Sequence, residues 1–214
     1  MQEETDSSIW RNGQFRAYLS ASAFSGMALA MQQLLLSWIL IGILLLPANQ
    51  VGLIQALIGI PGVFLMLMGG ASADRADPRN LLIWIYAIAP VFPLFLIAMD
   101  VSGWFAVWSV ILWGLGMSFV QSYSMPAQQA ILNRISGQHL QQGVTAATAA
   151  GFVVQVFGLG LAGQIDRWGI TPVLLSQAVV LGLAAFAMAR ITAVVTVDPK
   201  PEQSAVRGII EGLQ

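Results

Sequence analysis

The sequence predicts an all-α membrane protein with six transmembrane helices, arranged as an inverted repeat of three plus three. Of the 214 residues, 57 % are hydrophobic and only 9 % are charged, and the mean hydropathy is +0.76. A soluble domain carries about 25 % charged residues, because its surface must stay hydrated. The apolar runs reach the length of about 20 residues that a helix needs to cross a bilayer. This composition excludes a disordered protein, a nucleic-acid-binding domain and an ordinary soluble enzyme, and it makes the lipid bilayer the main partner.

Each of the six apolar runs ends at a polar or proline-containing break. The expected spans are 16–44, 51–70, 81–99, 104–125, 140–165 and 172–191. They form a bundle over residues 16–191, between a cytoplasmic segment at 1–15 and a cytoplasmic tail at 192–214. After the fourth span, Pro126 should end or kink the helix. Residues 127–135 should then form a short amphipathic helix that lies in the cytoplasmic interface.

The lysines and arginines set the expected orientation of the bundle. With the N-terminus inside, the inner segments carry eight of the nine Lys and Arg residues, and the outer loops carry only Arg167. Positive residues collect on the cytoplasmic side of multi-span proteins. Both termini are therefore expected in the cytoplasm.

Two turns of the chain share a pattern that indicates an internal repeat. Asp74-Arg75 and Asp166-Arg167 each follow a helix end of small residues, and a proline follows each pair. In the expected topology the two turns lie on opposite faces of the membrane, as an inverted repeat of three helices requires. The alternative is that two tight turns use the same dipeptide by coincidence.

The sequence offers no catalytic or metal-binding constellation. Cysteine is absent, which excludes disulfides and thiolate–metal sites. A rhomboid-like protease needs a Ser nucleophile and a His base on neighbouring helices, whereas the single histidine, His139, falls in a loop. The phosphate-binding motif G-x-x-x-x-G-K-[ST] does not occur, so an ATP-driven transporter would need its ATPase on another chain. We expect no enzyme activity, no metal and no cofactor.

Glutamines are the main polar side chains within the spans. The candidates to line a cavity in spans one, two, four and five are Gln32, Gln33, Gln55, Gln121 and Gln155. An amide group in hydrocarbon needs a hydrogen-bond partner, so these helices should face protein or a water-filled cavity. The alternative for each residue is that its amide forms a hydrogen bond between helices. Gln177 is an exception to this set, because it lies in span six.

The loop between the second and third spans carries a family signature. Its stretch GASADRADPR resembles the signature G-x-L-A-D-R-x-G-R-[RK] of the major facilitator superfamily. The matching residues are Gly70, Asp74, Arg75 and Arg79. Asp77 replaces the usual glycine, as in the branch of transmembrane secretion effectors that includes the enterobactin exporter, and Pro78 replaces a basic residue.

The resemblance implies the N-terminal six-helix half of a secondary transporter that moves a small molecule by alternating access, here in the efflux direction and in the inner or plasma membrane. It implies that helices one, two, four and five border the cavity. It also implies that Asp74 faces a second six-helix bundle and helps to hold the outward-facing state, and residues 192–214 resemble the loop before that bundle. The alternative is a truncated, non-transporting membrane protein, or a half-transporter that needs a second bundle for activity.

Overall fold

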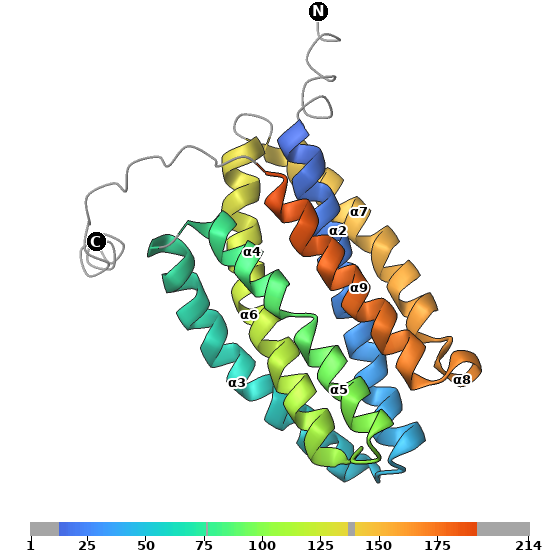
Figure 1. The fold of residues 1–214 in the computed structure, drawn as a ribbon. Coiled ribbons are helices and arrows are strands. Elements are labelled where there is room, and N and C mark those ends of the chain that lie inside the picture. The colour runs from blue at the N-terminus through green and yellow to red at the C-terminus, as the bar shows by residue number, and fades with distance from the viewer. Residues whose placement is uncertain (1–12, 76, 137–139, 192–214) are drawn as a thin grey trace, which may run out of the picture.

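The protein is an up-and-down bundle of helices. The computed structural model describes residues 13–75, 77–136 and 140–191, and for residues 63–75 it describes the backbone alone. The elements of the six crossings, in chain order, are α2 (Gly13–Trp38) with the π-helix η1 (Ile39–Ile43), α3 (Ala48–Arg75), α4 (Pro78–Ile88) with α5 (Val91–Val101), α6 (Val107–Ser136), α7 (Leu140–Ala162) with the short α8 (Ile165–Trp168), and α9 (Ile170–Ala189). Figure 1 shows that α2 begins and α9 ends at the same end of the bundle.

Four of the helical segments are long and apolar enough to cross a membrane. They are Gly13–Ile43, Pro78–Val101, Leu140–Trp168 and Ile170–Ala189 among the residues described. The helix α6 is less apolar because serines recur along it, at positions 109, 118, 122 and 124. Their hydroxyls donate to backbone carbonyls in several cases, as Ser122 does to the Gly62 carbonyl oxygen of α3 at 2.9 Å.

Local sequence explains where the third crossing begins and breaks. The Asp77 carboxylate accepts a hydrogen bond from the Arg79 backbone N–H at 3.1 Å, and Pro78 occupies the first helical position. Aspartate is a strong N-cap, and proline is favoured directly after it, because the amide hydrogen that proline lacks would have no helical partner. Asp77 and Pro78, two of the positions that depart from the family signature, therefore start α4. At Pro90 the crossing breaks into α4 and α5, since proline cannot donate within a helix.

The expected interfacial helix after the fourth span does not exist as a separate element. The helix α6 continues through Pro126 to Ser136, so the expectation for residues 127–135 is wrong. Ala127, Ile131 and Leu132 are at most 3 % exposed. Their apolar face packs within the bundle, and this burial outweighs the hydrogen bond that Pro126 removes. His139 lies outside the described residues.

The packing of the helices has the symmetry of an inverted repeat. The helix α2 packs mainly on α7 and α9, and α6 packs mainly on α3 and on the pair α4 and α5. The first crossing thus packs on the fifth and sixth, and the fourth crossing packs on the second and third. Exchanging the first three crossings with the last three leaves this pattern unchanged. Figure 1 shows that α2 and α6, the first helix of each set, run in opposite directions. The arrangement is that expected of inverted three-helix units in transporters.

A glycine brings α7 close to α2. A Cβ atom built at Gly158 would lie 2.6 Å from the Met27 carbonyl oxygen and 3.3 Å from the Ala30 Cβ atom. The first distance is shorter than a real side chain tolerates, so only glycine permits this approach. Small residues at such crossings let membrane helices pack closely, where no hydrophobic effect drives their association.

Candidate functional site

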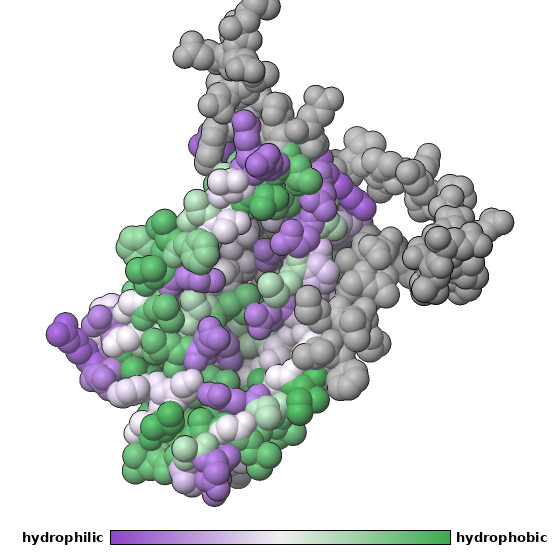
Figure 2. Space-filling model, turned by 180° about the vertical axis from the view of Figure 1, so that it is seen from behind, coloured by the Kyte–Doolittle hydropathy of each residue, from purple (hydrophilic) through white to green (hydrophobic). Residues whose placement is uncertain are grey.

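The bundle has two unlike sides. In Figure 1 the helices α4, α5 and α9 lie toward the viewer, and Figure 2 shows the opposite side, where hydrophilic residues interrupt a hollowed, otherwise hydrophobic surface. The helices α2, α3, α6 and α7 carry four exposed glutamines, and we call the surface around these glutamines the open face. They are Gln33 on α2, Gln55 on α3, Gln121 on α6 and Gln155 on α7. The four helices are the first, second, fourth and fifth crossings.

Hydrogen bonds and sequence position relate three of these glutamines, Gln33, Gln55 and Gln155, to one another. The Gln55 side-chain N–H donates to the Ser37 hydroxyl at 3.1 Å, which joins α3 to α2. Gln155 lies one helical turn before Leu159, which lines a groove together with Gln33. Among the described residues, Gln121 and Gln155 make no side-chain hydrogen bond. The open face therefore presents amide groups that neighbouring helices of the bundle do not satisfy.

Gln32 lies elsewhere, against α9. Its side-chain oxygen accepts a hydrogen bond from the Gln177 side-chain N–H at 3.2 Å, and the same N–H group donates to the Ala28 carbonyl oxygen at 3.0 Å. Gln177 is fully buried. The pair holds α2 and α9 together, which also accounts for a glutamine in the sixth crossing.

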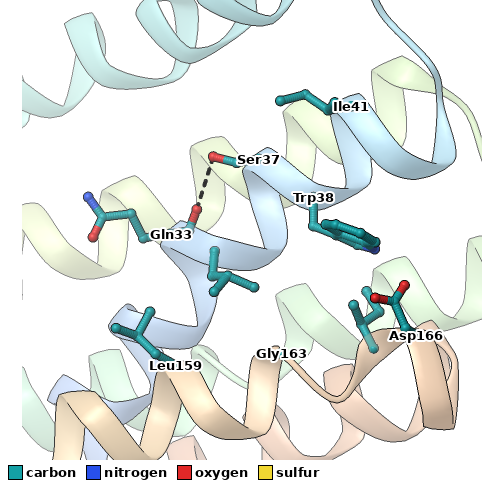
Figure 3. Close-up of a pocket in the computed structure, with 9 residues that line it drawn as sticks. Gln33, Ser37, Trp38, Ile41, Leu159, Gly163 and Asp166 are labelled. Carbon is teal, nitrogen blue, oxygen red and sulfur yellow. Dashed lines mark hydrogen bonds between the residues drawn. The ribbon is translucent and has the colours of Figure 1, made fainter.

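A groove opens between α2 with η1 on one side and α7 with α8 on the other, at the end away from Gly13 and Ala189. Its volume is about 610 Å³, and its lining residues are Gln33, Leu34, Ser37, Trp38, Ile41, Leu159, Gly163, Ile165 and Asp166. Figure 3 shows the Asp166 carboxylate directed toward the Trp38 indole across the groove. The lining is apolar except for Gln33, Ser37 and Asp166, and Asp166 carries its only charge.

An irregular helix end shapes this groove. Residues Ile39–Ile43 form a π-helix, and Leu45 beyond it has a φ of +52°, a left-handed conformation that leucine rarely adopts. π-Helical turns and strained residues recur at functional sites. Gly42 in this segment lies beneath Trp38, since a Cβ atom there would come within 3.1 Å of the indole Cε2 atom.

A buried polar cluster occupies the other half of the bundle, and sequence reasoning missed it. The Gln128 side-chain N–H group donates to the Ser25 hydroxyl at 3.1 Å and to the Tyr86 hydroxyl. The Ser22 hydroxyl donates to the Gln128 side-chain oxygen at 3.2 Å. The cluster joins α2, α4 and α6. The sequence favours an interfacial helix for Gln128, so only its true place in α6 could reveal the role.

The signature loop is described in part. For Gly70, Asp74 and Arg75 the structure describes the backbone alone, and the backbone of α3 continues to Arg75. The Arg79 guanidinium donates to the carbonyl oxygens of Ala189 and Ile191 at the end of α9, the former at 3.3 Å. A cation is favourable at the C-terminal end of a helix, where carbonyl groups lack partners. Arg79 therefore joins the start of the third crossing to the end of the sixth.

Among the described residues, no group of three His, Asp or Glu side chains comes together that could hold a metal ion.

Comparison with curated proteins finds no match. The family model described as Major Facilitator Superfamily matches residues 8–213. This match covers nearly all of the chain, and the described crossings agree with the N-terminal six-helix bundle of that family. Membership implies a multi-pass integral membrane protein for secondary transport of a small molecule, and not an enzyme. The chain belongs to the Major Facilitator Superfamily.

Proposed function

We propose that the open face forms one wall of the substrate pathway of an alternating-access efflux transporter, and that a second six-helix bundle forms the opposite wall. The observation that carries this proposal is the set of exposed glutamines on four helices, Gln33, Gln55, Gln121 and Gln155. An amide without a hydrogen-bond partner is unfavourable in hydrocarbon. A water-filled pathway removes that penalty, and contact with lipid does not.

The exposure of the fifth crossing supports a second bundle. In the most apolar 18-residue window of Leu140–Trp168, only 6 % of the residues are buried. The helix α7 packs mainly on α2, and large side chains such as Phe152 and Phe157 are more than 60 % exposed. A second six-helix bundle would cover part of this surface.

The proposed topology places both termini in the cytoplasm of a cell whose inner or plasma membrane holds the protein. Arg16, Arg79, Arg134 and Arg190 occur near helix ends at the end of the bundle where α2 begins, and Arg167 occurs at the other end. This distribution fits the positive-inside rule. A periplasmic reporter that is active when fused after residue 214 would contradict the orientation, and a cytoplasmic reporter active at the same position would support it.

We also propose that the signature loop acts as the conformational switch, with Gly70, Asp74, Arg75 and Arg79 as its residues. The resemblance of Asp77 to the secretion-effector branch supports the efflux direction. The support for Arg79 is structural, since its hydrogen bonds link the loop to the carbonyl oxygens of Ala189 and Ile191 at the end of α9.

Cysteine accessibility tests the pathway, because the chain contains no cysteine of its own. Gln121→Cys places a thiol on the open face, and Phe119→Cys is a matched control at the same depth of α6. The two positions point about 200° apart around the helix, and Phe119 is also exposed, at 41 %. In membranes, a charged methanethiosulfonate reagent should label Gln121→Cys at least about tenfold faster, because thiolate formation and reagent access need water.

Equal and slow labelling of both variants would mean that lipid covers the open face. That result would overturn the proposal and support the alternative of a non-transporting protein. Fast labelling of Gln121→Cys alone would support a hydrated pathway.

A further inference from the structure

We infer that the groove between α2 with η1 and α7 with α8 binds an amphiphilic organic cation, with the charged group held between Asp166 and Trp38. This inference rests on the proposed function, because it names the substrate class for the end of the open face. It adds a site, a ligand chemistry and the residues that select it.

The size and lining of the groove fit a compact apolar molecule. Its volume of about 610 Å³ falls within the range of about 300–1,000 Å³ found for small-molecule sites. Leu34, Ile41, Leu159 and Ile165 supply aliphatic surface from both sides. Such a surface recognises the apolar body of a ligand by burial and gives no preference for charge.

The polar groups of the lining favour a cation over an anion. The Ser37 hydroxyl is already occupied, since it accepts from Gln55 and donates to the Gln33 carbonyl oxygen at 3.3 Å. The lining residues include no Lys or Arg. An anion would therefore meet few free donors, and it would meet the negative charge of Asp166 as well.

Asp166 has the exposure and position to hold the positive group. It is exposed, and it forms no hydrogen bond or ion pair with the part of the chain that the structure describes. Arg167 is adjacent in sequence, but neighbouring residues of a helix do not face each other. A ligand seated between the apolar walls would displace water from the carboxylate, which strengthens the attraction between the carboxylate and a cation.

Trp38 supplies a second contact for the same group. Its indole lies over Gly42 and remains 38 % exposed, and in Figure 3 the Asp166 carboxylate points toward it. A cation between the two would meet a negative charge and the electron-rich face of the best aromatic partner. A lipid chain in the groove would instead leave the carboxylate poorly solvated.

The test measures binding of tetraphenylphosphonium to the full chain in nanodiscs of zwitterionic lipid, after subtraction of protein-free nanodiscs. Tetraphenylborate has the same shape and the opposite charge, and it should bind at least about tenfold more weakly. Asp166→Asn should weaken tetraphenylphosphonium binding about tenfold, which corresponds to about 1.4 kcal/mol, and Asp166→Glu should retain most of the affinity. Trp38→Phe should weaken binding about threefold, whereas Trp108→Phe, at a position of similar exposure (46 %), should leave it unchanged.

Two results would overturn the inference: equal binding of the two probes, which would indicate an apolar or lipid site, or unchanged affinity in Asp166→Asn. Helix content measured by circular dichroism shows whether each variant is folded. This test and the test of the proposed function can fail separately. If Gln121→Cys is accessible to water but tetraphenylphosphonium binding does not depend on Asp166, only this inference is wrong. If binding depends on Asp166 but Gln121→Cys is inaccessible, only the proposed pathway is wrong.

Discussion

The contact between α7 and α2 at Gly158 gives the sharpest test of how the bundle holds together. Gly158→Ala would place a Cβ atom 2.6 Å from the Met27 carbonyl oxygen, where ordinary contact begins at 3.4 Å. The deficit of about 0.8 Å is the difference between these two distances. The obstacle is a backbone atom, so no side-chain rotation relieves it, and α7 must move away from α2.

The expected magnitude follows from two opposing effects. Inserting a methyl group into a packed interface destabilises a protein by about 1–3 kcal/mol, and replacing glycine by alanine within a helix returns up to about 1 kcal/mol. We expect Gly158→Ala to lower the free energy of unfolding by about 1–2 kcal/mol. Gly160→Ala is the matched control, because Gly160 lies two residues away on α7, and a Cβ atom added there would meet nothing within 4 Å.

The free energy of unfolding of both variants is measured in mixed micelles of dodecyl maltoside and sodium dodecyl sulfate, with circular dichroism as the readout. The helix-propensity gain is common to the two, so the difference between them isolates the contact with Met27. If both variants unfold within about 0.5 kcal/mol of each other, which is the usual scatter for independent sites, the close approach does not stabilise the bundle and the reasoning fails.

Three further perturbations test the polar contacts. Gln128→Leu should lower the free energy of unfolding by about 2 kcal/mol, since it removes hydrogen bonds to three hydroxyls at about 0.6 kcal/mol each, and the exposed Gln129→Leu should change it little in the same micelle assay. Arg79→Gln should cost about 0.5–1.5 kcal/mol through the lost contacts with the end of α9, whereas Arg134→Gln, at an exposed position, should cost less than half as much. Asp74→Asn should reduce export of tetraphenylphosphonium from cells about two- to fivefold, the equivalent of about 0.3–1 kcal/mol at a helix terminus; unchanged export at an equal membrane level would contradict its role in the switch.

Sequence reasoning predicted a bundle of six helices but not the contacts between them. Long apolar runs predicted the crossings, because a bilayer demands about 20 apolar residues whatever the neighbours are. The extent of α6 was wrong because Pro126 normally ends a helix in water, and only burial of residues such as Ile131 reveals why this one continues. Asp77 and Pro78 depart from the family signature, and the structure shows that together they form a strong N-cap.

In the candidate site, the glutamines also show that the sequence predicts the helices but not their contacts. Gln32 and Gln33 are adjacent in sequence and equally polar, yet Gln32 hydrogen-bonds to Gln177 of α9 and Gln33 lies on the open face. Residues one apart on a helix differ by about 100° in direction. Without the neighbours of α2, nothing in the sequence indicates which direction leads to another helix and which leads to the groove.

The sequence by itself determined that the chain is helical, that it crosses a membrane and which family it belongs to, because these follow from hydropathy, length and a local motif. The tertiary structure alone decided which side of each helix packs. A membrane helix is apolar on every side, so the periodic pattern that marks the buried face of a soluble helix is weak or absent. The open face, the groove at Asp166 and the Gln128 cluster all depend on how each helix is rotated about its own axis. At the contact between α7 and α2, close packing at Gly158 restricts that rotation.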